Sequence, residues 1–275
     1  MTSSFPTTSP QRYARLGGAL YLAIIVFGVF SEGFVMSKLL VAGDAAATAR
    51  NLQAAPGLWQ WAVGLNVLLV LCAVPLQWIE YVLLRPVSHR LVLLALVLNL
   101  VSLSVESVSK VFLLLVLPTL ENPSYGSALG PQQVAVLAHL LLQAHGVAFN
   151  VALLFFGLTC LVNGYLIFKS GYLPKALGVG LQAAGAGYLV SCGAALFAPA
   201  LAGVLLPALL LLPFAGELSL SLWLLLKGVN TAAWMSLCSA KEGVAFKARH
   251  VVTEHQQVTA GIAANSPVSR PRTRP

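Results

Sequence analysis

The chain has 275 residues, of which 58% are hydrophobic and only 9% are charged, and its mean hydropathy is +0.85. A soluble protein of this size needs far more polar surface, so the composition excludes water as the main solvent. The formal charge of +8 would suggest nucleic acid if the basic residues gathered on one folded face, but they lie at the ends of apolar runs and in the C-terminal segment. We therefore expect no nucleic-acid partner.

Six long apolar runs, bounded by charged or turn-forming residues, occupy most of the chain. Each provides the roughly 20 apolar residues needed to cross a hydrocarbon core about 30 Å thick. None alternates with a period of two, and a spanning segment must satisfy its own backbone hydrogen bonds, so the runs predict helices. The fold class is thus an all-α integral membrane bundle of about six transmembrane helices, with the lipid bilayer as partner. The predicted spans are Leu16–Ser37, Trp59–Leu84, Leu91–Leu117, Val147–Phe168, Leu177–Phe197 and Leu201–Leu226.

Basic residues near the ends of these spans are divided unequally between the two sides. One side has seven, namely Arg12, Arg15, Arg85, Arg90, Lys169, Lys175 and Lys227. The other side has two, Lys38 and Arg50. Because basic residues accumulate on the cytoplasmic side, both termini are predicted to be cytoplasmic, with segments 38–58 and 118–146 facing outward.

Three regions follow one another along the chain. Residues 1–11 are rich in Ser, Thr and Pro and are expected to be a disordered leader, whereas residues 12–229 form the transmembrane domain. Residues 230–275 make a polar, basic tail whose prolines and arginines preclude a packed core, so disorder is expected there as well.

Apolar character continues from Pro131 to Phe168, which is far longer than one membrane crossing. We expect an interfacial or re-entrant helix from Gln132 to about Ala144, a break near Gly146, and then the fourth span. A single long fourth helix is the alternative.

Ionisable residues inside spans are costly, by about 2.5 to 3.5 kcal/mol each near the centre, and are therefore functional candidates. Glu106 and Lys110 lie four residues apart on the third span, a spacing that places opposite charges on one helix face. Asn99, Ser102 and Ser109 extend the same polar ridge, which must face protein or water. The ridge forms either one wall of a solute path or a self-neutralised pair that orders helix packing.

Glu217 lies near the middle of the sixth span, after Gly216 and downstream of Pro207 and Pro213, which favour kinks. A carboxyl group at that depth is expected to keep its proton unless a cation pairs with it. That property suits proton relay or hydrogen bonding to a ligand, and makes Glu217 the leading candidate. The alternative is a neutral acid that bonds to a neighbouring helix.

Glu32 lies in the outer part of the first span, near the level at which His139, Gln143 and His145 approach the outer face. These residues are expected to converge on an outward-facing polar pocket. His139 and His145 are weak candidates as metal ligands, but no H-x-x-x-H or H-E-x-x-H pair fixes a geometry, so no metal site and no cofactor are predicted.

Glu80 is expected at the cytoplasmic interface or paired with a basic neighbour. The glycines of the fifth span are attributed to close helix packing rather than to nucleotide binding.

Five sequence blocks together resemble the bacterial multi-pass membrane family known as domain of unknown function 4386. They are RLGGALYLAIIV from Arg15, GDAAATARN from Gly43, LRPV from Leu84, the long block FFGLTCLVNGYLIFKSGYLPKALG from Phe155, and GELSLSLWLLLKGV from Gly216. The resemblance spans residues 15–229, and its most specific part is the Ser-Gly-Tyr-Leu-Pro turn that begins at Ser170.

This resemblance implies a protein of about six spans in the bacterial cytoplasmic (inner) membrane, and it implies no established activity. The positions that match the family's features are Glu32, Asp44, Tyr172, Pro174 and Glu217. The resemblance also implies an acid near position 73, where this chain has Ala73. Independently, Asp44 is placed to cap a helix that runs toward Gln53, and a lid over an outward vestibule is the sharper hypothesis for it.

The sequence therefore favours transport or binding of a small or amphipathic solute at an outward-facing polar site. Glu217 would be its protonatable centre, the Glu106/Lys110 pair one wall, and Glu32 with His145 the mouth. Two alternatives remain. One is an intramembrane metal-dependent hydrolase that acts on lipid through His139, His145 and a glutamate; the other is a non-catalytic membrane partner or sensor subunit.

Overall fold

The computed structural model describes residues 9–198, 200 and 211–241, and within them the regular structure is helical. In chain order the helices are α1 (Pro10–Gly28), the π-helix η1 (Val29–Met36), α2 (Ser37–Leu39), α3 (Ala45–Ala54), α4 (Pro56–Leu84), α5 (His89–Glu121), α6 (Pro123–Leu129), α7 (Pro131–Ser170), α8 (Lys175–Phe197), α10 (Leu211–Leu226) and a last helix, Thr231–Lys241. The predicted all-α fold is confirmed.

Five of the described helical segments are long and apolar enough to cross a membrane, or six when the bent pair Leu211–Leu226 and Thr231–Lys241 counts as one span. The sixth predicted span began at Leu201, and its first ten residues lie outside the described part of the chain. Large apolar side chains such as Phe34, Leu71 and Val97 are more than half exposed, as surfaces that face lipid tails are.

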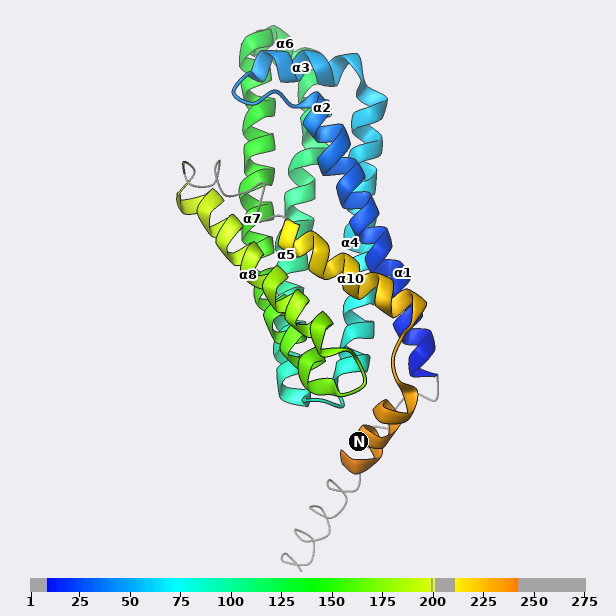
Figure 1. Ribbon diagram of the computed structural model, residues 1–275. Helices are drawn as coiled ribbons and strands as arrows, with labels where there is room; N and C mark the ends of the chain where they lie inside the picture. Colours follow the sequence, from blue (N-terminus) through cyan, green and yellow to red (C-terminus); the bar gives the residue numbers. More distant parts are fainter. Residues whose placement is uncertain (1–8, 199, 201–210, 242–275) are drawn as a thin grey trace, which may run out of the picture.

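The long helices run up and down the molecule (Figure 1). Helices α4, α5 and α7 stand side by side, α1 leans along α4, and α8 packs along α7. Helix α10 runs diagonally between α8 and α1 and contacts both. We call the end of the bundle that bears α3 and α6 the upper end, and the end that bears the α4–α5 and α7–α8 turns the lower end.

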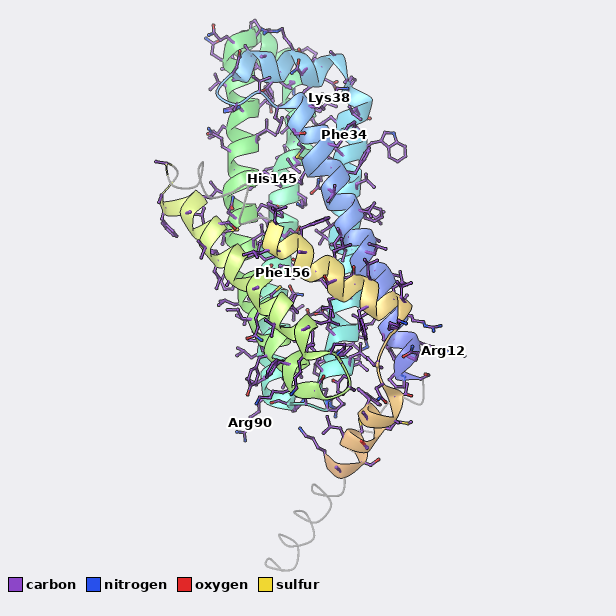
Figure 2. The ribbon with its side chains drawn as sticks, viewed as in Figure 1. Arg12, Phe34, Lys38, Arg90, His145 and Phe156 are labelled. Carbon is purple, nitrogen blue, oxygen red and sulfur yellow. The ribbon has the colours of Figure 1, made fainter. Side chains whose placement is uncertain are left out.

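Basic residues are concentrated at the lower end of this arrangement. Arg85 follows α4, Lys169 lies in the last turn of α7, and Lys175 begins α8. Figure 2 shows Arg12 and Arg90 at the lower end and Lys38 at the upper end. The unequal charge division read from the sequence therefore corresponds to two physical ends of the fold.

Helix α7 is continuous over 40 residues, so the break expected near Gly146 is absent and the separate helix from Gln132 to Ala144 was a wrong prediction. An isolated glycine weakens a helix by only about 1 kcal/mol, which tertiary packing offsets here. Val134 and Ala138 on the upper part of α7 are buried in an apolar cluster. At 1.5 Å per residue α7 is about 60 Å long, roughly twice the thickness of a hydrocarbon core. Helix α7 stands upright beside α5 (Figure 1), so it is longer than one membrane crossing requires.

Two separate apolar cores hold the bundle together. The upper core surrounds Trp59 and joins α3, the first turns of α4, the end of α5 and the start of α7. The lower core joins α1, the end of α4, the second half of α7, α8 and α10, with Leu166 fully buried in it. Between these cores lies a band of buried polar side chains.

Glycines bring α7 and α8 into backbone contact. A Cβ atom added to Gly164 would lie 2.7 Å from the carbonyl oxygen of Gly178, and one added to Gly185 would lie 2.6 Å from that of Gly157. Both distances are shorter than a nonbonded contact allows. The close packing predicted for the glycines of the fifth span is therefore confirmed at Gly178 and Gly185, whereas Gly193 has open space around its Cα.

The lower end is closed by a turn and the last helix. Gly171 adopts φ 73° and ends α7, which lets the Tyr172 hydroxyl donate a 2.6 Å hydrogen bond to the carbonyl oxygen of Leu83. The Trp234 indole donates to the same oxygen at 3.0 Å. Burial raises the pKa of the Tyr172 phenol above its ordinary value, so the hydroxyl remains a donor.

The sequence predicted a disordered tail from residue 230, but Thr231–Lys241 is helical and its Trp234 is buried. Residues 1–8 and 242–275 of the predicted leader and tail lie outside the described residues.

Candidate functional site

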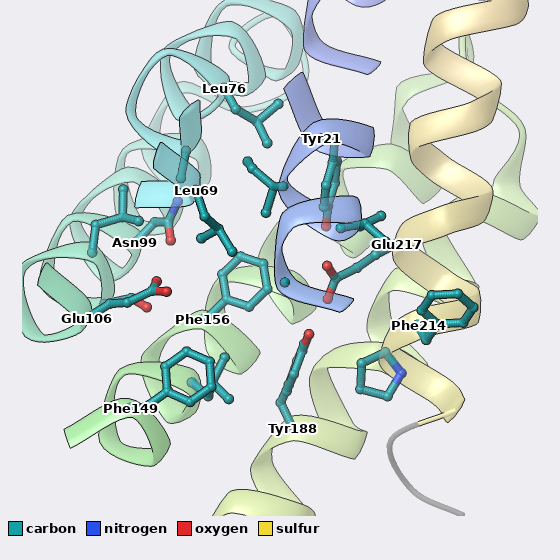
Figure 3. A pocket seen from close by; sticks show the side chains of 18 of the residues that line it. Tyr21, Leu69, Leu76, Asn99, Glu106, Phe149, Phe156, Tyr188, Phe214 and Glu217 are labelled. Atoms are coloured by element: carbon teal, nitrogen blue, oxygen red, sulfur yellow. The ribbon is translucent and has the colours of Figure 1, made fainter. Parts of the chain in front are cut away.

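A cavity of about 250 Å³ lies inside the bundle between the two apolar cores. Its walls come from α1, η1, α4, α5, α7, α8 and α10, so it is the place where nearly all the long helices meet (Figure 3). Most of the lining is apolar or aromatic. Three carboxyl groups, those of Glu80, Glu106 and Glu217, also line it.

Glu217 reaches the cavity from α10 because the residue before it is glycine. A Cβ atom on Gly216 would lie 2.5 Å from the carbonyl oxygen of Gly180, so only glycine lets α10 lie this close to α8. The Glu217 side chain is 93% buried, since its exposed fraction is 7%. The hydroxyl groups of Tyr21 and Tyr188 point at its carboxyl group from opposite sides as hydrogen-bond donors (Figure 3). Its Oε1 atom has no hydrogen-bond partner among the described residues.

Glu80 is a second carboxyl group of the same cavity, which corrects the expectation that it lies at the interface or pairs with a basic residue. Its Oε2 atom accepts a 2.9 Å hydrogen bond from the Asn163 side chain of α7. Glu80 and Glu217 are close enough to interact electrostatically. Glu80 lies seven residues after Ala73, which places both residues on one face of α4 and both on the cavity wall.

Glu106 and Lys110 form the predicted ion pair on α5, with 3.5 Å between Lys110 Nζ and Glu106 Oε1. Both residues are buried, as are Asn99, Ser102 and Ser109, so the polar ridge faces protein as expected. The Lys110 ammonium group also lies 4.3 Å from the centre of the Phe149 ring. This geometry places Glu106 on the cavity wall and its cation just above it.

Glu32 and His145 meet above the cavity, as the sequence predicted. The distance between Glu32 Oε1 and His145 Nε2 is 3.8 Å, and His145 Nδ1 lies 3.1 Å from the carbonyl oxygen of Ser109. His145 stacks on Phe149, the ring that Lys110 also covers. The pair therefore continues the polar band upward from Glu106 and Lys110.

A family model described as Domain of unknown function (DUF4386) matches residues 16–228, which is most of the chain and includes every residue of the cavity. The chain belongs to the DUF4386 family. No curated protein and no solved structure shows significant similarity to it.

In this DUF4386 protein the positions that match the family's features have distinct structural roles. Asp44 accepts a 2.8 Å hydrogen bond from the backbone nitrogen of Ala47 and so caps α3, as predicted. It does not line the cavity, and a lid function for it stays a prediction. Tyr172 and Pro174 shape the turn at the lower end, Pro174 as the residue before α8. Only Glu217 of this group faces the cavity directly.

His139 does not join His145 in the DUF4386 bundle. Six residues on a continuous helix correspond to a rotation of about 240°, so the two imidazoles leave α7 on different faces. Gln143 is exposed. Within the described part of the chain, no three His, Cys, Asp or Glu side chains come together as a metal site would require. The expected convergence thus occurs for Glu32 and His145 but not for His139 and Gln143.

Sequence reasoning missed four residues of the site, namely Tyr21, Glu80, Asn163 and Tyr188. A signal was available for Tyr188, because it lies in the middle of an apolar run rather than near its ends, where tyrosine usually anchors a span. Tyr21 lies near the start of its run and had no such signal. The contact between Glu80 and Asn163 joins residues 83 positions apart and has no local pattern.

Proposed function

We propose that this DUF4386 protein binds and transports a small amphipathic solute through its central cavity. One observation supports this most directly: carboxyl groups and aromatic rings face one cavity between the helices of a bundle whose outer surface is apolar. Ligand pockets have this character, with mainly apolar walls and a few polar groups that fix orientation. Polar groups that served packing alone would be expected to pair with one another and leave no space between them.

The position of the cavity also supports a transport path. It lies between the two apolar cores, and the polar band of Glu32, His145, Lys110 and Glu106 leads from it toward the upper end. Ionisable residues within spans commonly mark solute or proton pathways. In this proposal Glu217 is the central polar group and the Glu32/His145 pair borders the outward mouth.

The proposal is tested by the access of water to the cavity wall. In a protein whose four native cysteines are replaced, Ala73→Cys places a thiol on the wall, and Val74→Cys places one on the outer face, where Val74 is 53% exposed. A small membrane-impermeant methanethiosulfonate is added to vesicles of each orientation. Because only a hydrated thiolate reacts, Ala73→Cys should be modified and Val74→Cys should not.

The side from which Ala73→Cys reacts reports the direction of access. Modification from the upper side would indicate that the cavity opens toward the upper end, as an outward-facing site requires. Modification from the lower side would indicate that the cavity opens toward the lower end. If Ala73→Cys is inert from both sides while Ser127→Cys on the exposed helix α6 reacts in parallel, water does not reach the cavity and the transport proposal is wrong.

A further inference from the structure

We infer that the cavity recognises a lipophilic cation, meaning an ammonium or related cationic group attached to a compact apolar body. This inference rests on the proposed function, because it names the chemical class of solute that the same cavity would bind. Three features of the described residues support it: the balance of charge, a carboxyl oxygen without a partner, and the aromatic walls.

The first feature is an excess of acidic groups. Three glutamates line the cavity, and none of the described lining residues is Lys, Arg or His. Glu106 has Lys110 as its cation. Glu80 and Glu217 have no such partner among the described residues, since their neighbours are Asn163, Tyr21 and Tyr188. Two acids that share a poorly hydrated space favour a bound positive charge, and an anion would be repelled.

The second feature is the incomplete hydrogen bonding of Glu217. Its side chain is 93% buried, yet Oε1 has no hydrogen-bond partner within the described structure. Buried polar atoms usually have partners, so an orphan oxygen at a cavity wall indicates where a ligand group belongs. A cationic group beside Oε1 would supply both the charge and the contact that the protein does not provide.

The third feature is the aromatic wall. Phe149, Phe156, Tyr188 and Phe214 line the same cavity as the carboxyl groups, and Phe156 and Tyr188 meet edge to face with their ring centres 5.5 Å apart (Figure 3). Aromatic faces attract cations, above all poorly hydrated ammonium groups. Lys110 already shows such a contact in this protein, 4.3 Å above Phe149.

The size of the cavity restricts the solute further. A volume of about 250 Å³ exceeds that of a single water several-fold, since one water accounts for roughly 30 Å³ of the liquid. It suits a compact molecule with one ring or a short branched chain. The apolar lining from Leu69, Leu76 and Ile24 would cover the uncharged part of such a molecule.

Calorimetric titration of the full-length, detergent-purified protein with two probes tests the inference. Benzyltrimethylammonium carries a permanent charge, and N,N-dimethylbenzamide is a neutral molecule of similar size. The wild-type protein should bind the ammonium at least ten-fold more tightly. Glu217→Gln and Glu80→Gln should each weaken ammonium binding at least ten-fold and leave amide binding unchanged, because they remove charge and keep shape.

Matched controls separate the cavity from the rest of the protein. Glu121→Gln makes the same chemical change at an exposed position and should alter neither affinity. Ala73→Trp fills the cavity and should abolish binding of both probes, whereas Val74→Trp adds the same bulk on the outer face and should have no effect. Size-exclusion elution confirms that each variant is folded.

The possible results distinguish the two proposals. Equal affinity for the two probes, or ammonium binding that survives Glu217→Gln and Glu80→Gln, would overturn the cation inference and leave a solute cavity in place. Failure of the wild type to bind either probe would also overturn the cation inference. The proposed transport function fails only when Ala73→Cys is inert to thiol reagents.

Discussion

At the scale of single residues, the buried charges of this protein fall into two groups. Glu106 has a cation 3.5 Å away on its own helix, and Glu32 faces His145 at 3.8 Å. Glu80 and Glu217 are instead bonded by neutral donors. The difference separates acids that have a cationic partner within the fold from acids that have only neutral donors. The two kinds of site should therefore respond differently to substitution.

The Glu106/Lys110 pair should be strongly coupled. Lys110→Leu alone, or Glu106→Leu alone, leaves one charge buried without its partner and should destabilise the protein by about 3 to 5 kcal/mol. The double replacement removes both charges and should restore stability to near the wild-type level, because apolar pairs often replace buried ion pairs at no cost. Thermal unfolding of the four proteins in detergent gives the coupling directly.

Two outcomes of that cycle are informative for function. A double variant that is stable and retains ammonium binding would show that the pair has no essential role in packing or in binding. Additive losses from the two single changes would contradict the ion-pair geometry. Ser104→Leu, at an exposed position on the same helix, provides the control for the effect of added leucine.

The sequence predicted the members of the site whose signals are local. Glu106 and Lys110 have helical spacing, and Glu217 is conspicuous in an apolar run, so each could be singled out without a structure. Glu80 could not be placed, because its depth depends on contact with Asn163 from a distant helix. The sequence indicated which residues are anomalous and gave less information on which of them share a space.

At the scale of elements, the first span changes its winding in a way that its sequence does not announce. The π-helix η1 follows α1 directly and contains Glu32 and Gly33. A π-helix is wider than an α-helix and alters the direction of the side chains that follow. This segment presents Glu32 to His145, and π-helical segments are frequent at functional sites. Hydrophobic periodicity has no comparable signal for such a change.

Helix α7 misled sequence reasoning for a related physical reason. Its length was interpreted on the assumption that every apolar stretch ends where the bilayer ends, so a break was placed at Gly146. The structure keeps the helix intact because Val134 and Ala138 pack into the upper core. Apolar runs report burial, and burial in protein and burial in lipid look alike in a sequence.

The α7–α8 contact predicts a position-dependent effect of adding a side chain to glycine. Gly164→Val would place Cβ 2.7 Å from the backbone oxygen of Gly178, so the helices must separate. Overpacking of this kind costs about 1 to 3 kcal/mol, and we expect a clearly lower Tm in detergent. Separation of α8 would also move Tyr188 away from Glu217, so ammonium binding should weaken with stability.

Gly146→Val is the matched control, since it makes the same change in the same helix with no atom within 4 Å of the added Cβ. There the gain in helix propensity should leave the Tm unchanged or slightly raised. Equal losses at the two positions would show that flexibility of α7, rather than its contact with α8, explains these glycines.

At the scale of the whole molecule, two apolar cores flank one polar band, and each core joins a different set of helices. The lower core holds α8 and α10 against α1 and α7, while the upper core holds α3 against α4, α5 and α7 without α8 or α10. The cavity lies where these two packing units meet. If the protein transports a solute as proposed, access to the cavity would have to change at this junction, which the continuous helices α4 and α7 cross.

The same asymmetry predicts the orientation of the protein in its membrane. Basic residues gather at the lower end, and membrane insertion retains such residues on the cytoplasmic side. In a protein without native cysteines, Ser127→Cys on α6 marks the upper end and Ser239→Cys on the last helix marks the lower end; both positions are exposed. An impermeant maleimide applied to intact cells that express the protein should label Ser127→Cys at once and Ser239→Cys only after permeabilisation. The opposite pattern would invert the bundle and make the cavity's polar band face the cytoplasm. Labelling of both sites in intact cells would require an even number of crossings between them and would rule out the antiparallel topology derived from the helices.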